Sequence, residues 1–564
     1  MTLSGSYASG PSDKPLLGST IGKFFDYATG QYADREAVVS IHQQIRFTYS
    51  QLAERVNTLA KAFISAGLQK GDRIGIWSPN NVQWLITQYA TAKAGLILVT
   101  INPAYRSHEL AYVLRQSGCK GLVLQNNFKS SNYEQMLCEL CPELLNVSAG
   151  KLKSKEYEYL TTIISTTESS IKGIYSWADF NHLSKASSDQ DLDLRLSSQD
   201  MDDPINIQYT SGTTGFPKGA TLSHHNILNN GYFVAETMNF DENDRLVVPV
   251  PLYHCFGMVM ANLGCLTHGA CAIYPSEAFE PEAVLNAVQL EKATALYGVP
   301  TMFIAELALP NFSEYELKTL RTGIMAGAPC PVDTMTQVNE KMNMTEVEIA
   351  YGMTETSPVS FQTRVDSPFE KRVSTVGSVH PHVEVKIINP DTNKLCDVGE
   401  MGELCTRGYS VMLGYWENPK ATSQAIDEYG WMHTGDTAVM DEDGYVNIVG
   451  RIKDMVVRGG ENIYPREIEE YLMGHAEIED VQVTGVPDER FGEEIIAWVK
   501  LNGNSDLSEE DIKEFCKGRI AHYKVPRYIR FCDEFPMTVT GKVQKYKMRE
   551  ISIEELNLQE QETA

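Results

Sequence analysis

One stretch near the middle of the chain governs the interpretation of the whole sequence: Tyr209-Thr210-Ser211-Gly212-Thr213-Thr214-Gly215-Phe216-Pro217-Lys218-Gly219. Its glycines leave backbone N–H groups able to turn toward an anion, its hydroxyls supply further donors, and Lys218 adds a positive charge. A Walker A loop is excluded, because that loop carries Ser or Thr after the lysine at the start of a helix, whereas here Pro217 precedes the lysine and Gly219 follows it. We expect a mobile loop that closes on the β- and γ-phosphates of a nucleotide; a merely flexible surface loop is the alternative.

The length and charge of the chain exclude some classes of protein. With 564 residues the chain is longer than the roughly 250–300 residues at which a single hydrophobic core stops growing, so we expect a large layered part and at least one smaller domain. The formal net charge of −26 argues against nucleic-acid binding, which needs a basic face to displace counterions. Anionic substrates are still possible, because charges farther away than about 8 Å are screened at physiological salt and local lysines and arginines dominate.

Cysteine usage and the chain ends bear on the compartment. Eleven cysteines are scattered through the chain, which fits a reducing compartment better than a disulfide framework. We interpret the lone C-x-x-C of Cys138 and Cys141 as two buried thiols on a helix. The Gly/Ser-rich segment Met1–Gly18 resembles neither a secretory signal nor a transit peptide, and the final Gln-Glu-Thr-Ala is not a peroxisomal address. The longest uncharged run, 257–276, is interrupted by polar residues, so we expect a buried strand–turn–helix and no transmembrane segment.

Hydrophobic patterning predicts an α/β fold. Thr48 and Gln51 form a capping box, and the apolar residues that follow define one helical face that ends at Gly67. Strand-like segments occur at 73–77, 94–99 and 121–124, with a helical pattern at 84–93 between the first two. Strands that alternate with helices indicate layered α/β subdomains with largely parallel sheets.

The later parts of the chain differ in character. Residues 150–203 lack clear periodicity, and we interpret them as an insertion or surface excursion between two α/β halves. Beyond about residue 380, alternating segments such as 383–388 and 403–406 predict a small β-barrel-like subdomain. From 451 a final block has its own strands (481–486, 495–501) and helices (466–473, 508–520). We therefore predict an N-terminal domain at 1–450 and a smaller, mobile α+β C-terminal domain at 451–564.

Further motifs follow in an order that resembles a known superfamily. They are Ala350-Tyr351-Gly352-Met353-Thr354-Glu355-Thr356, then His433-Thr434-Gly435-Asp436, Gly450-Arg451-Ile452-Lys453-Asp454 and Pro536-Met537-Thr538-Val539-Thr540-Gly541-Lys542. Together with the stretch at 209–219 they resemble the adenylate-forming superfamily, which contains acyl-CoA synthetases, adenylation domains of peptide synthetases and beetle luciferases. The resemblance covers about residues 20–550. It is greatest to the medium-chain acyl-CoA ligases, in stretches such as 102–105, 203–208, 408–416 and 458–465.

The resemblance implies an ATP site. It implies that Tyr351 stacks on adenine, Thr354 donates to the α-phosphate, and Glu355, a hard oxygen ligand, binds Mg²⁺. The carboxylate of Asp436 would accept both ribose hydroxyls. Lys542 would stabilise the charge that develops when a carboxylate attacks the α-phosphate, because a compact ammonium fits between the two anions. The residues expected around ATP are Thr210, Ser211, Gly212, Thr213, Thr214, Gly215, Phe216, Pro217, Lys218, Gly327, Ala328, Tyr351, Asp436, Arg451 and Lys542.

The same resemblance implies a second half-reaction. The C-terminal domain would rotate about a hinge near Lys453, where many relatives carry Asp, and exchange adenylation for thioester formation. Arg458, Gly459 and Gly460 would then line the coenzyme A tunnel. A Gly-Gly turn alone does not require a ligand, so an ordinary turn is the alternative for that segment.

The acyl pocket is expected to be apolar. The segment 251–257, with His254 at its centre, resembles the motif that borders this pocket, and it lacks the Asp with which amino-acid-activating relatives pair the substrate ammonium. Burying an ammonium without a carboxylate is costly. The small apolar segments 298–300 and 326–329 also suit an alkyl chain. His254 is either a gate that moves when ATP binds or a core histidine with satisfied hydrogen bonds.

These expectations combine into one predicted function. The chain would ligate a medium-chain fatty acid to coenzyme A with ATP and Mg²⁺, through an acyl-adenylate, and release AMP and pyrophosphate. A luciferase-like or other adenylate-forming branch and an inactive acyl- or nucleotide-binding regulator are the alternatives. By family resemblance we expect the mitochondrial matrix, with the cytoplasm as the alternative. Neither the oligomeric state nor the acyl chain length follows from the sequence.

Overall fold

The computed structural model describes residues 5–210, 217–328, 330–458, 461–488, 490–503, 505–517, 519–537 and 543–558, with only the backbone at 461 and 462. The chain forms two compact units. The larger contains Ala8–Glu384 and Thr406–Met432, and the smaller contains Met1–Tyr7, Val385–Cys405 and His433–Ala564. The proposed domain boundary between residues 450 and 451 stays a prediction.

The first sheet of the larger unit has seven strands. β10 (Pro204–Thr210), β5 (Ile97–Ile101), β4 (Arg73–Trp77), β6 (Gly121–Leu124) and β9 (Thr162–Ser165) run parallel in that order. β11 (Lys218–Ser223) and β21 (Gly414–Tyr415) extend the sheet beyond β10 as antiparallel strands. A separate hairpin pairs β7 (Asn127–Phe128) with β8 (Ser131–Asn132).

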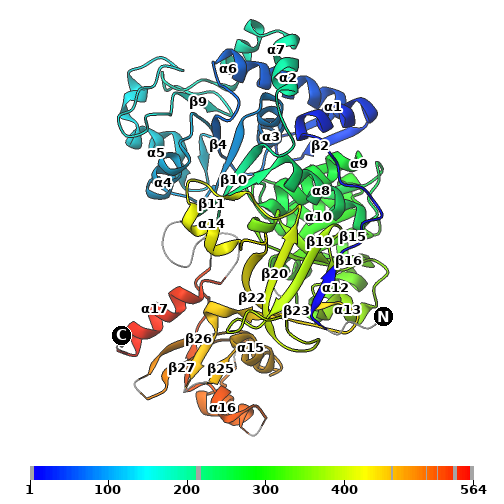
Figure 1. The fold of residues 1–564 in the computed structure, drawn as a ribbon, viewed down its shortest axis with the longest axis vertical. Coiled ribbons are helices and arrows are strands. Elements are labelled where there is room, and N and C mark those ends of the chain that lie inside the picture. The colour runs from blue at the N-terminus through cyan, green and yellow to red at the C-terminus, as the bar shows by residue number, and fades with distance from the viewer. Residues whose placement is uncertain are drawn as a thin grey trace. The chain divides into compact units, whose positions relative to one another are not determined.

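Helices cover both faces of this sheet, as the alternating side chains of its strands require. On β4, Ile74 and Ile76 join one core, whereas Trp77 joins another. The second core is closed by α4 (Ser107–Ser117) and α5 (Tyr133–Leu140), which lie on the opposite side of β4 from α3 (Figure 1). The helices that contribute to the first core are α1 (Ile21–Gln31), α2 (Tyr49–Ser65), α3 (Val82–Ala94), α6 (Trp177–His182) and α7 (Asp189–Ser197).

The second sheet has nine strands in the order β18-β17-β16-β15-β14-β12-β13-β2-β3. The strands β16, β15, β14, β12, β13 and β2 are parallel, and the others are antiparallel to their neighbours. Their bounds are β2 (Glu36–Ser40), β3 (Ile45–Thr48), β12 (Arg245–Val247), β13 (Cys271–Tyr274), β14 (Ala295–Gly298), β15 (Thr322–Ala326), β16 (Glu346–Gly352), β17 (Val359–Gln362) and β18 (Ser378–Val379).

The first core also lies against one face of this second sheet, so helices are sandwiched between the two sheets. It includes α8 (His224–Thr237), the π-helix η3 (Phe256–Leu263) and α9 (Gly264–His268). The other face is covered by α10 (Pro281–Glu291), α11 (Pro300–Leu307) and α12 (Val332–Lys341). Two further helices of this unit are α13 (Phe369–Ser374) and α14 (Pro419–Ala425). Helix α3 is buried around almost its whole circumference, as a position between two sheets requires. The predicted layered α/β fold is confirmed.

The smaller unit contains a second architecture. Most of a five-stranded sheet belongs to it, in the order β1 (Tyr7–Ser9), β19 (Val383–Ile388), β20 (Gly402–Gly408), β22 (Met432–Met440) and β23 (Val446–Arg451). A further sheet orders β25 (Glu461–Ile463), β24 (Val456–Arg458), β27 (Gly492–Leu501) and β26 (Ile478–Asp488), and β28 (Tyr528–Phe531) pairs with β27.

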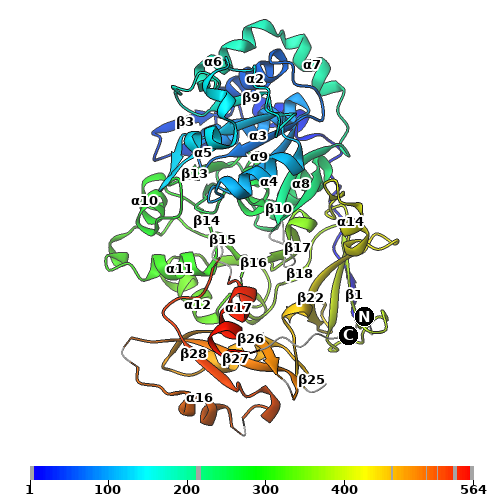
Figure 2. The same ribbon diagram turned by 90° about the vertical axis from the view of Figure 1, so that its left-hand side faces the viewer.

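Two cores flank β27 because its side chains alternate between faces. Ala497 packs with α15 (Pro465–Met473) and α16 (Glu509–Cys516), whereas Trp498 packs with α17 (Lys545–Glu555). Figure 2 shows α16 and α17 on opposite sides of this sheet. The α+β character predicted for the end of the chain is confirmed.

Local predictions were confirmed at some positions and wrong at others. The capping box of Thr48 and Gln51 is present, and Gly67 adopts a φ of +84° after α2. The strand predicted at 94–99 begins only at Ile97, because Ala94 ends α3 and Gly95 caps it in the left-handed region. The segment 257–276 contains helices followed by a strand, rather than a strand before a helix.

The interpretation of 150–203 as an insertion was wrong in one respect. The segment contributes β9 to the first sheet and the helices α6 and α7 to the layer above it. Cys138 lies on α5 as predicted and is half-buried, while Cys141 follows the helix and is buried. Within the described ranges, none of the helices combines the length and apolar character that crossing a bilayer demands.

Candidate active site

Parallel strands of the second sheet bring the predicted motifs of the larger unit to one edge. β12, β14, β15 and β16 are consecutive neighbours, and their carboxyl ends point the same way. The segments 251–257, 298–300, 326–328 and 351–355 lie at or beyond the carboxyl ends of these four strands in turn. In open α/β sheets, ligands bind outside the carboxyl ends of the strands. Topology alone therefore groups the predicted acyl-pocket and nucleotide motifs.

Glu355 is held by two hydroxyls that come from the other sheet. It lies in a short 3₁₀ turn, η5 (Thr354–Thr356), and its side chain is buried. Tyr415 OH on β21 donates to Glu355 Oε1 at 2.8 Å, and Thr210 Oγ1 at the end of β10 donates to the same oxygen at 3.3 Å. Burial and, next, the negative charge of Glu355 raise the pKa of Tyr415 above its ordinary value, so the phenol stays a donor at all physiological pH values. Residues of the seven-stranded and the nine-stranded sheet regions thus meet at the Glu355 carboxylate.

The strands that flank the Gly/Ser/Thr-rich stretch are paired neighbours. Thr210 and Lys218 face each other across the antiparallel β10–β11 ladder. Lys218 Nζ lies 5.0 Å from the centroid of the Tyr415 ring, a cation–π distance, and Tyr112 OH donates to Pro217 O at 2.9 Å. The ammonium, the phenol and the Glu355 carboxylate thus form one contiguous cluster. The predicted residues Ser211, Gly212, Thr213, Thr214, Gly215 and Phe216 lie outside the described residues.

In the nucleotide motif at the end of β16, Tyr351, Gly352 and Thr354 are partly or fully exposed, whereas Glu355 is buried. Tyr351, at the end of the strand, is half-buried, and its ring packs edge-on against Phe361 with centroids 6.0 Å apart. Gly352 cannot be replaced without rearrangement, because a Cβ there would lie 1.7 Å from Pro358 O. Thr354 is half-buried, and Gly327 and Ala328, which follow β15, are exposed. Gly327 adopts a φ of +89°, a conformation that favours glycine.

His254 lies at the start of the π-helix η3 and is only half-buried. Its carbonyl accepts a hydrogen bond from Met258 N at 2.9 Å, and its ring lies 4.5 Å from that of Tyr253. The adjacent Cys255 is buried and donates to Gln208 Oε1 at 3.3 Å. Burial raises the pKa of the Cys255 thiol well above its usual range, so this thiol is not a ready nucleophile. π-Helices often mark functional sites, and this one begins at the predicted acyl motif.

In the smaller unit, Asp436 and Arg451 face each other across the β22–β23 ladder. Arg451 Nε lies 2.9 Å from Asp436 Oδ1, and the carboxylate is buried while nearly half of the arginine side chain is exposed. Thr434 Oγ1 accepts a hydrogen bond from Asp436 N at 3.1 Å and donates to Leu404 O at 2.7 Å. The strand thus fixes the direction of the Asp436 side chain. The structure brings together Asp436, which the resemblance assigns to the ribose, and Arg451, which it assigns to the ribose or a phosphate.

The other predicted site residues of the smaller unit lie on separate elements. Lys453 is exposed in the 3₁₀ turn Ile452–Asp454. Arg458 Nη2 lies 2.7 Å from the buried carboxylate of Glu494, and its guanidinium lies 4.5 Å from the Phe491 ring centroid. Gly459, Gly460 and Lys542 lie outside the described residues. Met537 and Val543 form an antiparallel bridge.

Sequence reasoning missed Tyr415 as a site residue. The stretch 408–416 contributed to the family resemblance, but no role was assigned to any residue in it. Its strand β21 has only two residues, too few for periodicity to show which way a side chain points. Only the pairing of β21 with β11 brings this phenol to Glu355.

Comparison with known proteins shows which families, relatives and solved structures this chain resembles. The AMP-binding enzyme family matches residues 25–416, and the AMP-binding enzyme C-terminal domain matches residues 467–542. The Bacillus subtilis (strain 168) protein YngI, provisionally named an acyl-CoA synthetase, is 50% identical over 96% of this chain and 99% of its own. The Mus musculus medium-chain acyl-CoA ligase ACSF2, mitochondrial, is 44% identical over 98% of this chain and 91% of its own. The crystal structure of ATP-bound MatB from Rhodopseudomonas palustris superposes with a TM-score of 0.82 at 28% identity, covering 95% of this chain and 99% of MatB.

Proposed function

The chain belongs to the AMP-binding enzymes of the adenylate-forming superfamily and among them to the acyl-CoA synthetases, and on this basis we propose that it activates a medium-chain fatty acid. In the first step a carboxylate oxygen attacks the α-phosphorus of ATP, which yields the acyl-adenylate and releases pyrophosphate. In the second, the coenzyme A thiol attacks the acyl carbon, loses its proton and displaces AMP. The observation that carries the proposal is the cluster of Glu355, Tyr415, Thr210 and Lys218.

The charges of this cluster suit a metal-bound polyphosphate. Mg²⁺ prefers hard oxygen ligands and binds through one or two carboxylates together with phosphate oxygens. Here it would neutralise the negative charge of the phosphates. Glu355 is the residue that we propose as its ligand. Because both hydroxyls donate to Oε1, they orient the carboxylate, and Oε2 is the oxygen that we assign to the metal. Lys218 supplies a positive charge next to this carboxylate for the phosphates themselves.

The remaining nucleotide contacts are proposed by the position of each residue in the family motifs. Tyr351 stacks on adenine, Thr354 donates to the α-phosphate, and Asp436 accepts the ribose hydroxyls with Arg451 beside it. The exposed backbone of Gly327 and Ala328 borders the adenylate. Lys542 neutralises the two oxyanions that meet when the acid attacks.

The residues beyond the carboxyl end of β12 favour an apolar acid as the substrate. Segment 251–257 has no carboxylate, and the π-helix that follows is lined by buried apolar residues such as Met258, Val259 and Met260. A substrate ammonium would find no partner in this segment. The mouse relative's name specifies medium-chain acids, and each buried CH₂ contributes about 0.8 kcal/mol, so the depth of the pocket sets the preferred length.

The second half-reaction requires a different environment of the adenylate. We propose that residues 451–564 rotate about a hinge near Lys453, which withdraws Lys542 and brings Arg458, Gly459 and Gly460 to the pantetheine. The pair that Arg458 forms with Glu494 would hold the guanidinium in a defined direction. Location in the mitochondrial matrix stays a prediction, with the cytoplasm as its alternative, since one relative is named mitochondrial and another is bacterial.

A panel of straight-chain acids from butanoate to hexadecanoate tests this proposal. We expect AMP release that needs ATP, Mg²⁺ and coenzyme A, with the highest kcat/KM near octanoate to decanoate and with acyl-CoA as the product by mass spectrometry. An amino-acid panel serves as the control and should give no product. Release of free acyl-adenylate in the presence of coenzyme A, or no adenylate with any acid, would contradict the assignment.

A further inference from the structure

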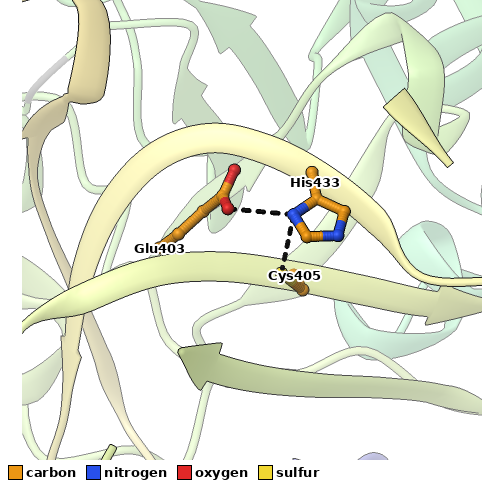
Figure 3. A group of neighbouring side chains, drawn as sticks. All are labelled: Glu403, Cys405 and His433. Atoms are coloured by element: carbon orange, nitrogen blue, oxygen red, sulfur yellow. Dashed lines mark hydrogen bonds and ion pairs between the residues drawn. The ribbon is translucent and has the colours of Figure 1, made fainter. Parts of the chain in front are cut away.

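Three side chains with metal-binding atoms meet in the smaller unit. Glu403 and Cys405 lie two residues apart on β20, so both point to the same face of the strand. His433, at the start of β22, points toward both of them (Figure 3). Cys405 is fully buried, whereas Glu403 and His433 are partly accessible. The cluster therefore combines a buried sulfur with two partly exposed side chains.

The distances in this cluster resemble those of a metal site. His433 Nδ1 lies 2.9 Å from Glu403 Oε2 and 3.7 Å from Cys405 Sγ, and the three ligand atoms all lie within 4.8 Å of one another. Around a tetrahedral Zn²⁺, with a Zn–S bond of about 2.3 Å and Zn–N and Zn–O bonds of about 2.0–2.2 Å, ligand atoms are about 3.3–3.6 Å apart. Side-chain adjustments on the order of 1 Å would complete the site.

The ligands are also oriented by the neighbouring backbone. Glu403 Oε1 accepts a hydrogen bond from Gly435 N at 3.2 Å, which leaves Oε2 directed at His433. Outer hydrogen bonds of this kind position metal-binding carboxylates. Among the described residues, these three form a group of His, Cys and Glu side chains whose ligand atoms lie close enough together to hold an ion. None of the three is used in the proposed reaction.

The geometry points to a binding site for one divalent transition-metal ion of the Zn²⁺ type, with Glu403, Cys405 and His433 as ligands and a fourth position for water. Thiolate with imidazole selects Zn²⁺ over Mg²⁺ or Ca²⁺, which prefer oxygen ligands. On binding, Cys405 gives up its thiol proton to solvent, so the affinity falls as the pH is lowered.

Occupancy would act on the strand that carries Asp436. The ion would join β20 to β22 at His433, three residues before that carboxylate and next to the Gly435 N–H that Glu403 already holds. Such a link would stabilise the folded state, because the ion binds the folded chain and not the unfolded one. The test of this metal site does not depend on the proposed ligase chemistry, because none of the three ligands takes part in it.

Cobalt substitution tests the site with a readout specific for thiolate ligation. The tag-free full chain, reduced with a phosphine, is titrated with CoCl₂ and followed by absorption. We expect one Co²⁺ per chain, a thiolate-to-cobalt charge-transfer band in the near ultraviolet, tetrahedral d–d bands in the visible, and loss of all of them when Zn²⁺ is added. Zn²⁺ should also raise the Tm.

Matched variants show which sulfur binds the ion. Cys405→Ser should remove the charge-transfer band and weaken Zn²⁺ binding by about a hundredfold or more. Cys396→Ser, which replaces another buried cysteine of the same unit, should leave both unchanged. Glu403→Gln keeps an acceptor for Gly435 N and should weaken binding while the band persists. Absence of a saturable one-site spectrum, or a band that survives in Cys405→Ser, would overturn the proposal.

Discussion

Replacing Tyr415 with Phe tests the geometry of the Glu355 cluster directly. The change removes one hydroxyl and keeps the ring, so the cation–π contact with Lys218 remains while Glu355 Oε1 loses its 2.8 Å hydrogen bond. Thr210 stays at 3.3 Å and compensates only in part. A hydrogen bond to a charged group contributes about 1.5–3 kcal/mol, and each 1.4 kcal/mol is tenfold. We therefore expect kcat/KM for MgATP to fall by about tenfold to a hundredfold.

The assay should isolate the adenylation half-reaction. Acid-dependent ATP–pyrophosphate exchange, measured across a Mg²⁺ titration, should show a lower rate and a higher apparent Mg²⁺ requirement for Tyr415→Phe. Transfer of a supplied acyl-adenylate to coenzyme A should be unaffected. Tyr409→Phe is the control, because Tyr409 is also half-buried but its hydroxyl contacts Asn230 and not Glu355.

A double-mutant cycle distinguishes a positioning role from a general loss of stability. If Tyr415 acts through Glu355, then adding Tyr415→Phe to Glu355→Gln should cost little beyond Glu355→Gln alone. Exchange within twofold of wild type in the single variant, with an unchanged Mg²⁺ dependence, would refute the reasoning. Fully additive losses in the cycle would do the same.

Three further outcomes are expected. Lys542→Ala should abolish adenylation and spare transfer from a supplied acyl-adenylate; surviving pyrophosphate exchange would show that the lysine has another role. Asp436→Asn removes the carboxylate paired with Arg451 and should weaken ATP binding by about tenfold to a hundredfold in calorimetry; unchanged affinity would exclude a ribose contact. Burial raises the pKa of Glu348, which accepts a hydrogen bond from Gln362 at 2.6 Å, to about 8. Between the ordinary pKa of a glutamate and about 8, the folded state therefore keeps a proton on Glu348 that the unfolded state has released, so the stability of the fold decreases as the pH rises through this range. Glu348→Gln should raise the Tm more near pH 8 than near pH 5; equal shifts at both pH values would contradict this.

Local sequence signals predicted elements whose stabilising interactions are also local. The capping box at Thr48 and the strand at 73–77 were read correctly because caps and short-range periodicity involve neighbouring residues. The predicted start of the strand at Ala94 was wrong. Helix α3 and strand β5 are both almost completely buried, so hydrophobic periodicity does not show where the helix ends and the strand begins. The prediction failed also for 150–203, because β9 has only four residues and is stabilised by pairing with β6, a contact between distant parts of the chain.

For the candidate site, the sequence by itself determined the kinds of groups present: a Gly/Ser/Thr-rich stretch ending in Lys218, the carboxylates Glu355 and Asp436, and an apolar segment around His254. Their order along the chain identified the family, since motif order is a property of the sequence. Only the tertiary structure decided which groups meet. Tyr415 and Thr210 reach Glu355 because β21 and β10 belong to one sheet and η5 follows a strand of the other. Likewise, Cys405 and His433 meet through pairing of strands that are separated in the sequence, and such pairing depends on packing energies summed over the whole unit rather than on any local pattern.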